Sequence, residues 1–417
     1  MKTLDAPSTN WQRNTALFLA GQALTYFGTM LVQFGIMWHI TLESQSGKIM
    51  TLFIAAGFLP MFFVSPFAGV WADRYNRKYL INIADATIAV FTLITACAIL
   101  AGVTSYAILF ACAFIRSIAQ GIQRPTVGAF IPQIAPKEHL TRVNGVQSSI
   151  DSFIALASPM ISGALMKFAP LHILFFVDVA SSCIGIFILA FFVKAPAREK
   201  AADTDTTQSG SSYFKELLDG LRYIKEHKFI LQLFTLFALF LILIAPAAWL
   251  TPLQAVRKFG VEEWGLTAVE VAFSLGAVIG GILVSTWGGL KNRVHTIALS
   301  YLLSGSFALL LGIVPFFTLY LVIMGIVGLA MPLRSAQVMV ILQTKVESLF
   351  IGRVLSVFSM IISTMLPMGM LIFGPLADVI SIDVILIISG ALIVLLAIPL
   401  LTSKNLIEAG IITKTNT

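Results

Sequence analysis

Twelve long apolar runs, separated by mostly short polar loops, constrain this chain more than any other feature of its sequence. Each run approaches the roughly 20 residues that an α-helix needs to cross the hydrocarbon layer of a membrane. None shows the strict alternation of a membrane β-barrel strand. The sequence therefore predicts an all-α membrane protein with twelve transmembrane helices, over residues 16–40, 49–71, 79–100, 105–130, 143–166, 171–193, 229–251, 266–288, 294–312, 316–340, 354–377 and 382–402.

The composition agrees with a membrane location. Of 417 residues, 58% are hydrophobic and 11% are charged, whereas soluble proteins average about 45–50% apolar and about 25% charged residues. One soluble core could not bury such a surplus of apolar side chains. The first run is too long for the apolar part of a signal peptide, so we expect it to remain as the first helix.

The positive charges are distributed unequally between the two sides of the predicted membrane domain. With a cytoplasmic N-terminus, about 20 of the 27 Lys and Arg residues lie on the cytoplasmic side and about four on the other. The positive-inside rule then predicts a multi-pass protein of the cell inner (cytoplasmic) membrane, with both termini cytoplasmic. The net charge of +7 is accordingly assigned to contact with anionic membrane lipid and not to nucleic acid.

A polar segment at 194–228 separates six runs from the next six. Its first part is poor in apolar residues and is predicted to be a linker. From Tyr213 onward apolar residues recur at helical spacing, which predicts an amphipathic helix on the inner leaflet. We therefore expect an N-terminal six-helix half at 1–193, this linker with its helix at 194–228, and a C-terminal six-helix half at 229–417.

The two halves share a pattern of special residues around the fourth and fifth run of each. The matching triplets are Gly121, Pro125 and Gly145 in the first half, and Gly328, Pro332 and Gly352 in the second. Such a match favours a duplicated six-helix unit. Two related six-helix halves with a solute bound between them are typical of transporters of the major facilitator type.

The short loop between the second and third runs concentrates charge in a defined order, with Gly69, Asp73, Arg74, Arg77 and Lys78. This spacing resembles the loop 2–3 signature of the major facilitator superfamily, from which only Asn76 departs. The resemblance implies a conformational latch, in which the glycine lets helices 2 and 11 approach and the aspartate meets a helix N-terminus and nearby arginines. The simpler interpretation is an orientation signal, with the cations holding the loop inside.

Three longer segments extend the resemblance, namely 19–41, 57–78 and 114–132. They are similar to the macrolide-efflux (Mef) proteins and their drug:proton antiporter relatives. The resemblance implies a proton-coupled secondary exporter of bulky amphipathic drugs, macrolides among them, that confers antibiotic resistance by alternating access. A facilitator or exporter of another small molecule, such as a siderophore, lipid or metabolite, would share the same fold.

Five ionisable residues fall inside apolar runs: Asp85, Arg116, Asp151, Asp178 and Glu270. Because a charge in the hydrocarbon is costly, such residues face an interior or pair with one another. Asp178 is the first candidate for the proton carrier and Asp151 the second, with Arg116 as a fixed cation; a purely structural ion pair is the alternative. Asp85 is a third proton-coupling candidate and is expected to join the latch through Arg74 or Arg124.

The first run offers candidates for a substrate cavity, which are Gln22, Tyr26, Met30, Gln33 and Phe34. Nothing resembles a nucleotide-binding loop, a metal cluster or a catalytic triad, so we expect no enzyme activity and no cofactor, with the proton gradient as the energy source. The expected partners are a small-molecule substrate, protons and membrane lipid. We expect the protein to function as a monomer.

Overall fold

The computed structural model describes residues 10–103, 105–194, 209–347 and 350–411, without the side chains of Val70, Asp73, Lys137 and residues 209–217. The described part is almost entirely helical, and twelve of its helices are long and apolar enough to cross a membrane. This confirms the predicted all-α membrane fold. The chain forms two compact units: unit 1 contains Met1–Ile40 and Leu52–Thr207, and unit 2 contains Thr41–Thr51 and Gln208–Thr417.

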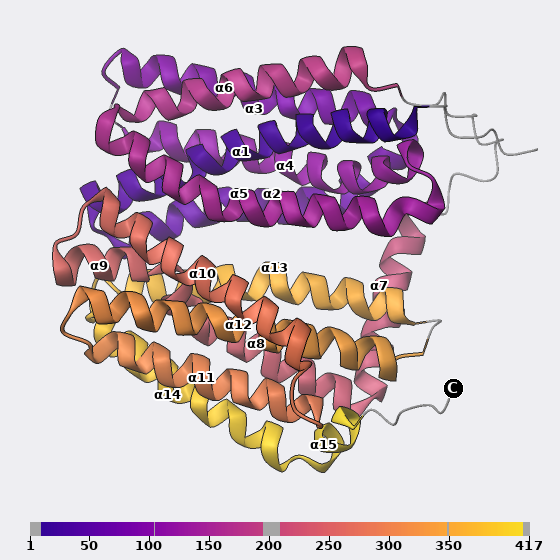
Figure 1. The fold of residues 1–417 in the computed structure, drawn as a ribbon, viewed down its shortest axis with the longest axis vertical. Coiled ribbons are helices and arrows are strands. Elements are labelled where there is room, and N and C mark those ends of the chain that lie inside the picture. The colour runs from indigo at the N-terminus through magenta and orange to yellow at the C-terminus, as the bar shows by residue number, and fades with distance from the viewer. Residues whose placement is uncertain (1–9, 104, 195–208, 348–349, 412–417) are drawn as a thin grey trace, which may run out of the picture. The chain divides into compact units, whose positions relative to one another are not determined.

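Unit 1 is built from the first six long helices (Figure 1). They are α1 (Trp11–Ser44), α2 (Gly47–Arg74), α3 (Arg77–Leu100), α4 (Tyr106–Ile134), α5 (Leu140–Phe168), which follows the 3-10 turn Lys137–His139, and α6 (Leu171–Phe187), which continues as a π-helical turn over Ile188–Phe192. The tip of the α1–α2 hairpin, Thr41–Thr51, belongs to unit 2.

Local sequence signals start the helices of unit 1, and small residues bring them together. Asn76 caps α3 by accepting a hydrogen bond from the Lys78 amide at 3.0 Å, and Ser105 caps α4 in the same way. A side chain at Gly185 on α6 would collide with Thr25 and Gly21 of α1. The two backbones therefore touch, as small residues allow in membrane helices.

Unit 2 holds the remaining long helices and three short or peripheral ones (Figure 1). They are α7 (Ser209–Glu226), α8 (Lys228–Trp249), α9 (Thr251–Phe259), α10 (Glu263–Trp287), α11 (Arg293–Ile313), α12 (Phe317–Lys345), α13 (Ile351–Leu376), α14 (Ile382–Thr402) and α15 (Lys404–Gly410). Gly260 and Gly288 end α9 and α10 with φ of 63° and 71°, a left-handed conformation that suits glycine.

Close glycine contacts also organise unit 2. The helices α10 and α12 meet where Gly276 faces the Gly325 backbone, and α11 and α14 meet at Gly305 and Gly390. A side chain at Gly276, Gly305 or Gly390 would overlap the backbone of the facing helix. Behind these contacts lies one apolar cluster built from α7, α8, α11, α12, α13, α14 and α15.

The helix predicted in the polar segment is present as α7, and one side of it packs onto unit 2. Tyr223 and Ile224 are buried in the unit 2 cluster, and the Tyr223 ring stacks on Phe350 with centroids 4.5 Å apart. Leu218 and Leu221 remain exposed. The side chain of Phe214 lies outside the described part of the structure. Contact with the inner leaflet and the domain limits 1–193, 194–228 and 229–417 stay predictions.

Candidate functional site

An ion pair lies in the interior of unit 1. Arg116 on α4 donates from Nη1 to Oδ2 of Asp178 on α6 over 2.5 Å, and both side chains are buried. Thr92 on α3 accepts a hydrogen bond from Arg116 and donates one to Asp178 at 3.2 Å. The second terminal nitrogen of Arg116 donates to the Thr29 carbonyl of α1 at 3.3 Å. Four helices thus converge on one guanidinium.

Helix α1 closes over this pair at Gly28. A Cβ atom at that position would overlap Ser181 and the backbone of Asp178, so only glycine fits. The other carboxylate oxygen of Asp178, Oδ1, is buried and has no hydrogen-bond partner among the described residues. Within the described part of the chain, this carboxylate oxygen therefore has unused capacity to accept a hydrogen bond.

A second carboxyl group lies in the same interior. Asp85 on α3 is buried, receives a hydrogen bond from Gln123 of α4, and has Gln22 of α1 beside it. Asp85 is also close enough to Asp178 to interact electrostatically. The expectation that Asp85 joins Arg74 or Arg124 is therefore wrong, because its partners are the two amides, which carry no charge.

The charge balance of this interior follows from these contacts. Among the described residues of unit 1, the buried charged side chains are Asp85, Arg116 and Asp178. Asp178 pairs with the guanidinium of Arg116, whereas the partners of Asp85 are the uncharged amides of Gln123 and Gln22. Burying Asp85 as a carboxylate would be costly, and protonation is the usual relief. The arrangement therefore has the chemistry to hold a proton.

Asp151, the second predicted proton carrier, has a different environment. It is exposed on α5 and lies within electrostatic range of Arg124 of α4. The Arg124 guanidinium in turn lies 5.7 Å from the centre of the Tyr26 ring on α1. The structure therefore brings together Asp178, Arg116 and Asp85 and leaves Asp151 outside that cluster.

The charged loop between α2 and α3 is held by backbone carbonyls of unit 1. Arg77 donates to the carbonyls of Ala72 and Ala129 at 2.8 and 2.7 Å. Lys78 donates to the carbonyls of Ala190 and Val193 at 2.9 and 2.8 Å, where α6 ends and a positive charge is favoured. These bonds join the loop to α4 and α6.

The latch itself stays a prediction. Arg74 is exposed, and the side chain of Asp73 lies outside the described part of the structure. A Cβ atom added at Gly69 would meet no other atom within 4 Å. The close helix approach expected at this glycine therefore also stays a prediction.

An open groove of about 830 Å³ runs between α1 and α5 of unit 1. Its walls are mostly apolar and are lined by Ala23, Leu24, Phe27, Arg142, Gly145, Val146, Ser149, Ile150, Phe153 and Ile154. The five residues predicted for a cavity do not line it: Gln22 and Tyr26 face Asp85 and Arg124, Phe34 packs near Trp38, and Met30 and Gln33 are half-buried. The sequence predicted that the polar side of α1 lines the substrate cavity, whereas Leu24 and Phe27 of α1 line the groove.

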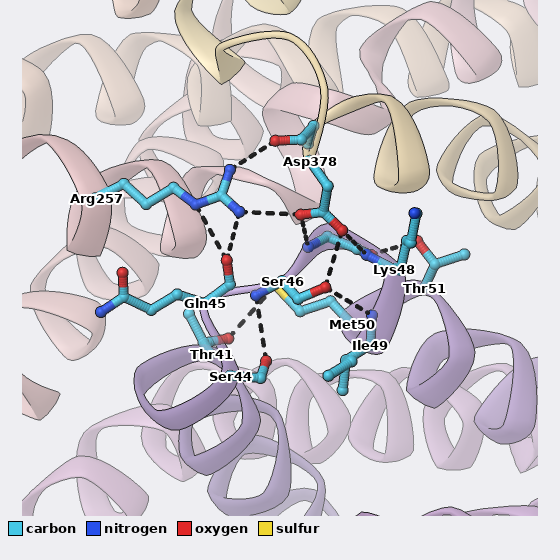
Figure 2. A network of polar contacts seen from close by, with 12 residues as sticks. Thr41, Ser44, Gln45, Ser46, Lys48, Ile49, Met50, Thr51, Arg257 and Asp378 are labelled. Carbon is cyan, nitrogen blue, oxygen red and sulfur yellow. Dashed lines mark hydrogen bonds and ion pairs between the residues drawn. The ribbon is translucent and has the colours of Figure 1, made fainter.

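Unit 2 contains a polar network that sequence reasoning missed, centred on Asp378 after α13 (Figure 2). The Asp378 carboxylate accepts hydrogen bonds from the first amides of α2, those of Gly47 at 2.7 Å and Lys48 at 3.0 Å. It also accepts the Ser46 hydroxyl at 2.8 Å and the Arg257 guanidinium at 3.0 Å. A carboxylate at a helix N-terminus is stabilised by the unpaired amides there.

Arg257 and the backbone around Gln45 complete this network (Figure 2). Gln45 has φ of 43°, unusual for a residue with a side chain, and its carbonyl accepts from Arg257 at 3.1 Å. Arg257 also donates to the Ala377 carbonyl at 2.6 Å. The sequence offered a weak signal: Ser46 precedes Gly47 as a helix cap would, but nothing local points to Asp378.

The pKa of Asp378 reflects this setting. Burial by itself raises the pKa of the carboxyl group, but the hydrogen bonds from Lys48, Gly47, Ser46 and Arg257 outweigh it, so the pKa lies below its ordinary value. A cavity of about 400 Å³ beside the network is lined by Gln254, Arg257, Lys258 and residues 377–383. Its second acid, Asp383, pairs with Lys258 at 3.0 Å.

Arg334 on α12 is the one charged residue that unit 2 buries among the described residues. Its Cζ lies 4.0 Å from the ring centre of Phe240 and 5.6 Å from that of Phe237, both on α8. A desolvated cation over an aromatic ring gains about 2 kcal/mol, whereas burial of an ion costs several kcal/mol. The rings therefore compensate only part of this charge.

The described residues do not gather three His, Cys, Asp or Glu side chains as a protein metal site would. The candidate site consists of the buried Arg116–Asp178 pair with Asp85 and the apolar groove in unit 1. In unit 2 it includes the polar network around Asp378 and the buried Arg334. A twelve-span helical fold with a buried charge cluster defines a membrane transporter class, and comparison with known proteins gives its family.

The family model described as Major Facilitator Superfamily matches residues 18–365. The chain belongs to the major facilitator superfamily and is a transporter of that family. It is 26% identical to the macrolide efflux protein A of Streptococcus pyogenes over 93% of this chain and 95% of that protein. It is 27% identical to the protein of the same name in Enterococcus faecalis, over 75% of this chain and 96% of that one.

More distant relatives agree with this assignment. The multidrug efflux pump Tap of Mycobacterium bovis is 23% identical over 87% of this chain and 86% of that protein. Among solved structures, a POT family transporter in complex with a thioalcohol-conjugated peptide matches with a TM-score of 0.74 at 12% identity, over 93% and 95% of the two chains. A bacterial homologue of the iron transporter ferroportin, in an inward-facing state, matches with a TM-score of 0.70 at 15% identity, over 94% of this chain and 99% of that one. These structures share the fold.

Proposed function

We propose that this protein is a proton-coupled secondary exporter of bulky amphipathic drugs that works by alternating access. The observation that carries the proposal is the buried Arg116–Asp178 pair, with a free acceptor at Asp178 Oδ1 and a second carboxyl group at Asp85. The relatives named for macrolide and multidrug efflux support an export function. Antibiotic resistance follows from the same proposal.

Protonation of Asp178 is the coupling step in this proposal. A proton on Oδ1 removes the negative charge that compensates Arg116, so the attraction between Arg116 and Asp178 weakens, while Thr92 and the Thr29 carbonyl remain as neutral partners of the guanidinium. Because the Arg116–Asp178 pair joins α4 to α6, the strength of this helix contact depends on the protonation state. The carboxyl group and the helix contacts are thus linked in one step.

The energy available from one proton is sufficient for drug efflux. One charge crossing a potential of 100 mV carries about 2.3 kcal/mol. At a driving force of about 150 mV, one proton sustains a solute gradient of a few hundred-fold. No nucleotide is required, and the proton gradient is the proposed energy source.

The groove between α1 and α5 is the proposed contact surface for the apolar body of the substrate. Its volume of about 830 Å³ is in the range of sites for drug-sized molecules, about 300–1,000 Å³. Leu24 and Phe27 of α1 and Phe153 of α5 supply apolar area. The charged loop with Asp73 is proposed as the conformational latch, anchored through Arg77 and Lys78.

Transport into inverted membrane vesicles tests this function. We expect uphill uptake of a macrolide such as erythromycin when the vesicles are energised, and its loss when a protonophore dissipates the proton gradient. Vesicles from cells with the empty vector are the control. Uptake that survives the protonophore but stops on ATP depletion would assign the energy to a partner ATPase and contradict antiport. Uptake of a siderophore, lipid or metabolite in place of the macrolide would favour the alternative substrate classes.

A further inference from the structure

The two arginines that are buried among the described residues, Arg116 and Arg334, have opposite environments. Arg116 has a carboxylate, a hydroxyl and a carbonyl as partners. Arg334, within the part of the chain that the structure describes, has no hydrogen bond and no ion pair, and its Nε is buried without a partner. It keeps 8% of its surface exposed, against 2% for Arg116, so Arg334 is the one with residual access.

The acids of unit 2 cannot supply the missing charge. Asp378 pairs with Arg257 and Asp383 with Lys258. Asp219 faces Arg353, and Glu270 lies outside the electrostatic range of Arg334. The titratable neighbour of Arg334 is Tyr301 on α11, whose hydroxyl donates to the Leu236 carbonyl at 3.2 Å.

The aromatic contact leaves the hydrogen-bonding capacity of Arg334 unused. The Cζ atom of Arg334 lies over the Phe240 ring, 4.0 Å from its centre. A guanidinium carries five N–H donors, and an aromatic ring offers none of them an oxygen acceptor. The donors of Arg334 therefore have no oxygen acceptor among the described residues, and a guanidinium can bind a carboxylate or phosphate through two parallel hydrogen bonds.

We propose that Arg334 is the recognition site for an oxyanion, a carboxylate, sulfonate or phosphate, on an amphipathic ligand. The rings of Phe237 and Phe240 contact the guanidinium, and the ligand anion takes the N–H groups that have no acceptor among the described residues. This inference rests on the proposed function, because the ligand is the solute that the exporter transports. It adds amphipaths that carry a negative group to the drugs named in the proposed function.

Two probes that differ only at the polar end test this site. They are 1-pyrenebutyrate, which is an anion, and 1-pyrenebutanol, which is neutral, and their affinities for the purified full-length protein in detergent can be measured by microscale thermophoresis. We expect wild-type protein to bind the anion at least about 10-fold more tightly, as a charge-assisted hydrogen bond provides. Arg334→Gln should lose this preference and bind the neutral probe as wild type does.

Matched variants separate recognition from a general charge effect. Arg334→Lys keeps the charge and should keep a preference for the anion. Lys291→Gln removes an exposed positive charge of the same unit and should leave the preference unchanged. An equal affinity of wild type for both probes, or an unchanged preference in Arg334→Gln, would overturn the proposal and leave Arg334 as a structural cation on its rings.

The test remains decisive if Arg334→Gln does not elute as a single species. Competition of bound 1-pyrenebutyrate by benzoate, but not by benzamide, in wild type and Arg334→Lys then supports the site, and equal competition overturns it. The binding measurement needs no proton gradient. Failure of energised efflux with an intact anion preference therefore counts against the proposed function alone.

Discussion

Arg116 and Asp178 form an ion pair of 2.5 Å although 62 residues of the chain separate them. The pair connects the middle of α4 to α6 and is shielded by α1 at Gly28. Among the described residues Oδ1 of Asp178 has no hydrogen-bond partner, while Oδ2 accepts from Arg116 and Thr92.

The first prediction concerns the proton carrier. Asp178→Asn mimics a permanently protonated carboxyl group, so we expect it to abolish uphill efflux and to preserve substrate binding and downhill exchange. The accumulation ratio should fall from a few hundred-fold to about one. The measurement is proton release on substrate addition to the purified protein. If the variant releases as many protons as wild type, Asp178 is not the carrier and Asp85 and Asp151 are the next candidates.

Arg116→Ala should behave differently from Asp178→Asn. It leaves Asp178 buried without its cation, and removal of one partner from a buried pair costs about 3–5 kcal/mol. We expect reduced expression and loss of both uphill efflux and exchange. Recovery of expression and of uphill efflux in the double variant Arg116→Ala with Asp178→Asn would identify the pair as purely structural.

Gly28 gives a prediction about packing. Gly28→Ala places a methyl group against Ser181 and the Asp178 backbone, and overpacking of this kind destabilises by about 1–3 kcal/mol. The control is Gly128→Ala on α4, where an added Cβ meets no atom within 4 Å and the gain in helix propensity is about 0.5–1 kcal/mol. The midpoint temperature of thermal unfolding, measured by size-exclusion chromatography, should fall for Gly28→Ala only. Equal midpoints for the two variants would show that α1 does not pack closely against α6 at Gly28.

From the pKa of Asp378 we predict how the stability of the hairpin tip Thr41–Thr51 depends on pH. Because the pKa of Asp378 in the folded protein lies below its ordinary value, the carboxylate stabilises the fold above the ordinary pKa, and this contribution is lost as pH falls through the lowered value. The hairpin should therefore stay protected at mildly acidic pH. Hydrogen exchange of the amides of Gly47 and Lys48, corrected for the intrinsic rate, measures this.

A matched pair of variants isolates the effect of Asp378. Asp378→Asn should speed exchange at the start of α2, whereas Asp383→Asn, which removes an acid of the same cavity that pairs with Lys258 instead, should not. If the two variants exchange alike, the carboxylate of Asp378 does not hold the hairpin.

The charged loop between α2 and α3 supplies the last prediction. Asp73→Asn should impair transport at normal expression if the loop is a latch. Arg77→Ala combined with Lys78→Ala should mainly lower folding yield, because these side chains hold the carbonyls of Ala129 and Val193. Transport kinetics are compared at matched membrane levels. Normal kinetics in Asp73→Asn would leave the loop as an orientation signal.

Local properties of the sequence determined the fold class and the family of this protein. The length and hydropathy of each run identify a membrane span, and the loop spacing from Gly69 to Lys78 resembles that of the major facilitator superfamily, whose family model matches residues 18–365. The rarity of charge in the runs singled out Asp178 and Arg116 as residues that need a partner. None of these signals depends on how the helices are rotated or placed.

Only the tertiary structure decided which side chains meet. Asp85 has amide partners and not an arginine, the groove uses Leu24 and Phe27, and Asp378 caps a helix that begins more than 300 residues earlier. Such pairings depend on the rotation of each helix about its axis and on how closely glycines let helices approach. Those quantities are set by packing across the whole unit, so a single stretch of sequence does not contain them.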